Sequence, residues 1–241
     1  MGAILTIQLS AFGNKRILPS TENIAILMPK LKELSGIEFL PNIVNSQKID
    51  ITTGAIENVP NLSFSSTNNS GQVICTENRI DCIFNFNIDH QEGIDDRFNV
   101  ASAIIQFIMN YTSVFANRLA LNVTYLSNIC SGNSIFETQV MHVVPFYQNK
   151  TIKEWSSRTN AMGTMKINGI DESLNVITEY THATEQTTKE TRIVCHTDIN
   201  TVPENKDFRF KSDAIDSFEK QAKSIFVEIQ SDLEGLVADE E

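Results

Sequence analysis

The chain has 241 residues, 41% of them hydrophobic and 20% charged, with a net charge of −11 and a pI near 4.8. This length can bury a sizeable core, and the composition is that of an ordinary globular protein. The acidity argues against a nucleic-acid partner, because nucleic-acid-binding proteins present a basic face. The opening residues lack a basic leader and no apolar run is long enough to span a membrane, so we expect a cytoplasmic protein with no membrane contact.

The four cysteines form no Cys-x-x-Cys pair, which favours reduced thiols in an intracellular protein. If residues 78–79 close a tight turn, Cys75 and Cys82 would face each other across a hairpin. A redox pair is one interpretation, but two buried thiols in a sheet are the more ordinary one. The other two cysteines are Cys130 and Cys195.

The first part of the chain predicts a strand followed by a helix. Apolar and polar residues alternate at the start of the chain, which is typical of a half-buried strand. Residues 19–22 form a capping sequence, apolar residues follow at helical spacing, and Gly36 ends them. Pro29 lies inside this pattern, so we expect a kink or two short helices. Residues 38–46 then predict a loop, and residues 48–52 a strand.

Residues 61–88 contain the clearest β pattern of the first half. Leu62 and Phe64 alternate with polar residues, residues 68–71 predict a turn, and residues 80–88 alternate almost strictly. This pattern predicts an antiparallel meander with one buried face. We expect the segment 80–88 to be able to present an unpaired edge to another subunit.

Residues 95–115 predict a central helix. Apolar residues recur at helical spacing and cover more than half of the circumference. Such a helix must be covered on several sides, so we expect it to lie between two β-rich halves. The residues of this stripe are Val100, Ile104, Ile105, Phe107, Ile108, Tyr111, Val114 and Phe115.

Beyond the central helix, two strands and a short helix are predicted. Residues 118–126 and 136–144 alternate as strands, and Pro145 stops the second. Residues 151–154, Thr-Ile-Lys-Glu, fit a capping box and predict a short helix that carries Trp155.

A hairpin and a long helix close the chain. Asn168-Gly169 is a hairpin-type turn. Residues 174–182 and 191–199 predict a second long hairpin. Residues 212–236 then predict an amphipathic helix with Ser212 as its cap.

These elements predict an α+β fold in which antiparallel β-meanders in two halves pack around the central helix, with a long amphipathic C-terminal helix. We expect a single domain, 1–241, with pseudo-halves 1–92 and 117–241 joined by the helix at 95–115. No low-complexity linker separates the halves, which favours close packing. No residue-level repeat is visible, so a duplication is a hypothesis about topology alone.

The order of elements resembles a sporadically distributed bacterial family of similar length with no assigned activity. The resemblance is carried by the opening strand and helix, the closing helix, and residues 61–66, 71–74, 78–81 and 118–126. It rests on apolar spacing and turn positions and carries no catalytic residues to transfer. It implies an intracellular α+β protein, and a patchy distribution would suit mobile-element or defence gene neighbourhoods.

The best polar cluster for chemistry lies in the second long hairpin. His196 and Asp198 share one face of their strand, and pairing across the turn could bring Glu179 opposite His196. Two carboxylates and an imidazole can hold a divalent metal or share a proton. Such residues are also ordinary on a sheet face that contacts water, and no HExxH or HxH motif accompanies them. We name the three as catalytic candidates, and expect no metal and no cofactor.

No other catalytic signature is present. The sequence has no GxSxG motif and no phosphate-binding glycine loop. Cys195 and His196 are neighbours in a strand and point to opposite faces, so they cannot act on each other directly. Trp155, the single tryptophan, is a candidate anchor for a partner or ligand, although a lone tryptophan more often covers a core.

We therefore hypothesise a non-enzymatic, cytosolic protein-interaction or regulatory subunit that binds a protein partner in a bacterial defence, toxin-neutralising or phage system. The first alternative is a metal-dependent or hydrolytic enzyme that uses Glu179, His196 and Asp198. The second alternative is a structural or assembly protein that acts through homo-oligomerisation.

Overall fold

The computed structural model describes residues 2–49, 51–131, 154–185 and 188–238. The predicted strand at 136–144 lies outside these residues. Within them the chain forms nine strands and three helices. The strands are β1 (Ala3–Gly13), β2 (Phe39–Ile49), β3 (Ile56–Ser66), β4 (Gly71–Cys75), β5 (Arg79–Asn85), β6 (Ala116–Ile129), β7 (Ser156–Ile167), β8 (Ile170–Thr184) and β9 (Thr191–Thr201), and the helices are α1 (Thr21–Ser35), α2 (Ile94–Thr112) and α4 (Asp213–Ala238).

All nine strands belong to one antiparallel sheet, in the order β2-β3-β4-β5-β1-β6-β9-β8-β7. The α+β prediction with antiparallel meanders is therefore confirmed. β1 lies at the centre, where Ile7 faces Phe84 of β5 on one side and Val123 of β6 on the other. This pairing joins the two meanders into a continuous sheet.

The two sides of the sheet share one topological plan. Each side has a central strand, β1 or β6, and a meander whose last member pairs with that central strand; the meander has four strands on the first side (β2 to β5) and three on the second (β7 to β9). A helix follows each meander, α2 on the first side and α4 on the second. The antiparallel β1–β6 pair relates the two sides.

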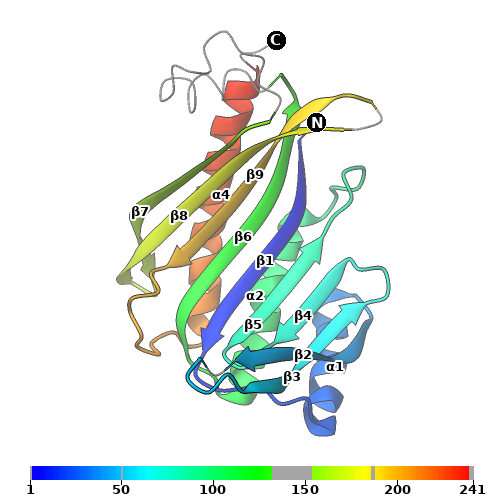
Figure 1. Ribbon diagram of the computed structural model, residues 1–241, viewed down its shortest axis with the longest axis vertical. Coiled ribbons are helices and arrows are strands. Elements are labelled where there is room, and N and C mark those ends of the chain that lie inside the picture. The colour runs from blue at the N-terminus through cyan, green and yellow to red at the C-terminus, as the bar shows by residue number, and fades with distance from the viewer. Residues whose placement is uncertain (1, 50, 132–153, 186–187, 239–241) are drawn as a thin grey trace.

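The three helices cover one face of the sheet, behind the strands in Figure 1. α2 lies between α1 and α4 and contacts β1 and β5. The α2 residues Ile104, Ile105 and Ile108 are fully buried. Lys223 Nζ lies 2.7 Å from Asp95 Oδ1, which ties α4 to the start of α2. The helix-bearing face holds the main core, and no helix of the described residues lies on the opposite face, which is called the helix-free face below.

Two of the predicted boundaries change in the first half. α1 is one continuous helix despite Pro29, and Gly36 ends it with φ 70°, a backbone conformation that favours glycine. The segment predicted as a loop, residues 38–46, belongs to β2, which pairs with β3 along its whole length. The prediction was wrong because β2 is exposed on both faces beyond Phe39, so its apolar residues do not alternate with polar ones.

Two further predictions are corrected. β5, predicted at residues 80–88 with a free edge, lies inside the sheet between β4 and β1; among the described strands the two edges are β2 and β7. Trp155 directly precedes β7 and is not itself helical. Residues 151–153 of the predicted capping box lie outside the described residues.

No helix in the described ranges combines the length and the apolar character that crossing a membrane requires.

Candidate functional site

The predicted catalytic candidates lie on the helix-free face of the sheet. Glu179 of β8 pairs directly with His196 of β9, as predicted, and His196 pairs with Thr124 of β6. Thr124 Oγ1 lies 3.1 Å from His196 Nδ1. Asp198 lies two residues further along the same face, where its carboxylate accepts a hydrogen bond from Asn200 Nδ2 at 3.0 Å. The sheet thus brings Glu179 and His196 together and gives Asp198 a different partner.

The three candidates are not arranged as a metal centre. Among the residues that the structure describes, no group of three or more His, Cys, Asp and Glu side chains is placed to hold one ion. His196 is exposed, and Glu179 and Asp198 are half-buried. Glu179, His196 and Asp198 therefore form part of a polar sheet surface that contacts water, as is common in antiparallel sheets, and do not enclose a reaction site.

A second polar cluster on the same face surrounds Asp81, which is fully buried. Ser10 Oγ and Gln8 Nε2 donate hydrogen bonds to Asp81 Oδ1, at 2.6 Å and 3.1 Å. Arg79 Nε lies 2.8 Å from Asp81 Oδ2 in an ion pair that lacks the alignment of a hydrogen bond. These contacts join β1 to β5, so we assign the cluster to the architecture of the sheet.

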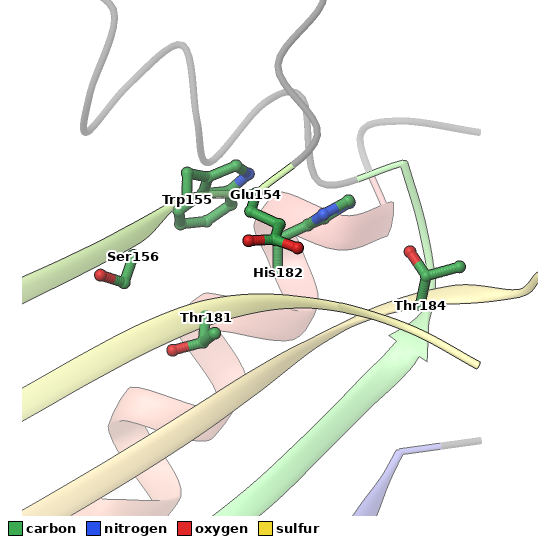
Figure 2. Close-up of a pocket in the computed structure, with 6 residues that line it drawn as sticks. All are labelled: Glu154, Trp155, Ser156, Thr181, His182 and Thr184. Atoms are coloured by element: carbon green, nitrogen blue, oxygen red, sulfur yellow. The ribbon is translucent and has the colours of Figure 1, made fainter. Parts of the chain in front are cut away.

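Trp155 lines a surface pocket of about 480 Å³ at one end of the sheet (Figure 2). Its ring stacks on His182, with centroids 6.1 Å apart and planes inclined by 21°. The backbone joins the same pair, since His182 N–H donates to Trp155 O at 3.2 Å. The remaining lining residues are Glu154, Ser156, Thr181 and Thr184. The sequence offered no partner for His182, because this stack depends on the register between β7 and β8.

None of the four cysteines forms a disulfide, and all four are buried. Cys75 pairs with Ile80 and Cys82 with Val73, so the two thiols are offset along the hairpin rather than directly opposite. Burial, together with the negative charge of Asp81, raises the pKa of Cys75 to about 12. Burial likewise raises the pKa of Cys82 and of Cys195. Such thiols are poor nucleophiles at neutral pH, because the thiolate is the reactive form.

One buried acid in the helical layer, Glu219 of α4, lacks hydrogen bonds. It is 1% exposed, and neither carboxylate oxygen has a hydrogen-bond partner among the residues that the structure describes. Burial raises its pKa, against the positive charges of Lys223 and Lys220 and with the negative charge of Asp216. Glu219 lies one helical turn after Ile215 and so falls within the apolar stripe of α4. An acidic residue inside an apolar stripe is visible in the sequence and indicates a buried acid.

The most unusual surface is the β2–β3 hairpin, residues 39–66. Fifteen large hydrophobic side chains are exposed in the described part of the chain, and six of them lie between residues 40 and 56. They are Leu40, Ile43, Val44, Ile49, Ile51 and Ile56. Exposed apolar side chains that gather on one segment point to an interaction site, whereas single ones scattered over a surface do not.

The backbone of the hairpin is also open to a partner. β2 pairs with β3 on one side only, so its other side presents N–H and C=O groups that no strand in the described ranges covers. Lys48, Asp50 and Glu57 are the only charged residues of the hairpin, although the chain as a whole carries −11. This site was not predicted from the sequence, because residues 38–46 were interpreted as a loop. The low density of charged residues in this segment was the signal that could have indicated a binding surface.

Comparison with models of protein families gives no match, and comparison with curated proteins finds no relative. The resemblance to a bacterial family therefore stays a prediction.

Proposed function

We propose that this chain is a non-enzymatic, cytoplasmic protein-interaction or regulatory subunit, and that the β2–β3 hairpin is its binding surface. The observation that carries the proposal is the concentration of exposed apolar side chains on an edge strand of the sheet. Removing apolar surface from water stabilises a complex by roughly 25 cal/mol per Å². An edge strand adds backbone hydrogen bonds to a partner that is itself extended. A protein supplies both kinds of contact, whereas a small molecule cannot supply a strand.

A hydrolytic activity is the second candidate, and one observation favours it. Glu179 and His196 are direct cross-strand neighbours, which is the relation that a carboxylate and an imidazole need in order to share a proton. Both residues lie on an open sheet face, and Asp198, the third candidate, accepts its hydrogen bond from Asn200. A hydrolytic function is therefore less well supported than protein binding.

The test is affinity capture from the native host with three tagged chains. They are the wild type, Val44→Lys on β2, and Met162→Lys on β7, the opposite edge, where Met162 is 75% exposed. We expect the wild type and Met162→Lys to bring down the same protein in stoichiometric amount, and Val44→Lys to lose it. The proposal fails if all three chains capture the same proteins, or if none of them captures any.

A further inference from the structure

We propose that the occupant of the β2 edge is a second copy of this chain, paired antiparallel with the first about a twofold axis at Asn42. The inference rests on the proposed function, because it names the partner of the same surface. It follows from three features of β2: its sequence, its unpaired backbone and its charge.

The sequence of β2 is self-complementary around Asn42. The five residues Leu40-Pro41-Asn42-Ile43-Val44 have a polar residue at the centre and two apolar residues on each side. A twofold interface brings the same patch of both subunits together, so each residue must suit the residue it meets on the other copy. With Asn42 on the axis, Leu40 meets Val44 of the second copy and Pro41 meets Ile43 of the second copy.

Both faces of the sheet would gain apolar contacts from this register. Ile43 and Pro41 pair with Leu62 and Phe64 of β3, whose side chains are fully buried on the helix-bearing face. Leu40 and Val44 lie on the other face, because side chains alternate along a strand. Leu40, Ile43 and Val44 are 58%, 53% and 44% exposed, so each has surface left to bury.

The backbone and the central amide fit the same register. The unpaired N–H and C=O groups of β2 would form a ladder with their counterparts, although Pro41 has no N–H and can only accept. Asn42 would meet Asn42 of the second copy, and two amide side chains can donate to and accept from each other. A polar pair at the centre of an apolar strand pair disfavours shifted registers, since a shift would place an amide against an apolar side chain.

Charge also favours a second copy at this position. Two chains of net charge −11 repel each other, so the surface on which they meet must carry little of that charge. Residues 39–47 contain no charged residue. β7, the opposite edge, carries Arg158 and Lys166, which protect an edge strand against pairing.

The oligomeric state is the first test. Sedimentation of the purified wild type should show a species of twice the 27.0 kDa chain mass that grows with protein concentration. Val44→Lys, which places an ammonium against Leu40 of the second copy, should remain a monomer, while the control Met162→Lys should behave as the wild type. Circular dichroism should be the same for all three, since both positions are exposed. A wild type that stays monomeric at every concentration overturns the inference.

The register is the second test. Under oxidised glutathione, Asn42→Cys should form a covalent dimer, because residues that face each other across antiparallel strands have Cβ atoms within about 5.5 Å. Gln47→Cys on the same strand should not, since in this register it does not meet itself. The native thiols give little background because all four are buried. Equal cross-linking of both variants, or of neither, overturns the inference.

The inference and the proposed function fail separately. If Asn42→Cys does not cross-link and the wild type is monomeric, but Val44→Lys still loses a host protein that the wild type captures, the second copy is wrong and the hairpin remains the binding surface. If Val44→Lys changes neither the oligomeric state nor the captured proteins, both are wrong.

Discussion

Replacing Glu219 of α4 should make the protein more stable at neutral pH. The side chain is 1% exposed, and within the described ranges neither carboxylate oxygen has a hydrogen-bond partner. The two lysines whose charges act on Glu219 are already paired, Lys223 with Asp95 and Lys220 with Asp216. Leaving a buried polar group unsatisfied costs about 1–3 kcal/mol, and more when it is charged. We expect Glu219→Met, which keeps the side-chain volume and removes the charge, to raise the free energy of unfolding by at least ~1 kcal/mol.

The sign of the pH dependence follows from the raised pKa of Glu219. The folded state holds the proton at pH values where the unfolded chain has already lost it. The folded state therefore loses stability as the pH rises from the ordinary glutamate pKa through the raised folded value. The advantage of Glu219→Met should be full above the folded pKa and should shrink as the pH falls through this window.

Urea unfolding at neutral and at acidic pH measures both effects. Glu228 lies on the same helix and is exposed, so Glu228→Gln is the matched control and should change the free energy of unfolding by less than about 0.5 kcal/mol. The reasoning is refuted if Glu219→Met is less stable than the wild type at neutral pH, or if its advantage grows as the pH falls.

Three further predictions concern the core, the thiols and the open sheet face. Ile104→Asp should lower the free energy of unfolding by more than about 4 kcal/mol, because it buries an unpaired charge. Phe107→Asp should cost clearly less, because Phe107 is only half-buried. Urea unfolding compares the two variants, and equal losses would contradict the different burial of the two side chains. Cys75, with its pKa raised to about 12, should react with a thiol reagent only after unfolding at pH 7, and rapid labelling of the native chain would refute its burial. His196→Ala should leave stability within about 0.5 kcal/mol of the wild type, since the side chain is exposed; loss of a metal or of a hydrolytic activity from the purified variant would instead favour the enzymatic alternative.

The sequence predicts a helix or strand well where one face of that element is buried and the other is exposed. α2 and α4 show helical spacing because one side of each is covered, and β5, β8 and β9 alternate because one face of the sheet is covered by helices. The pairing of Glu179 with His196 was predictable for the same reason, because two alternating strands joined by a short turn have few registers.

The remaining features depend on contacts that a local pattern does not contain. β2 has no single buried face, so it has no period to detect. Asp81 lies at a position of β5 where the alternation predicts an exposed, polar side chain. It is buried because of β1, a neighbouring strand that is distant in sequence. Phe107 belongs to the apolar stripe of α2 but lies toward α1, where Lys30 Nζ sits 5.8 Å from its ring centroid, so it is less buried than the stripe suggested.

Hydrogen exchange at β2 tests the central claim most directly, because it reports on the backbone groups that the claim assigns to a partner. Amides of an unpaired edge strand exchange rapidly, and pairing with another strand protects them. We predict that those amides of residues 39–45 that do not already face β3 become more protected as the wild-type concentration rises, while those of β7 do not change. If exchange along β2 is independent of concentration, and is unaltered by Val44→Lys, the claim that this edge binds a second copy of the chain is contradicted.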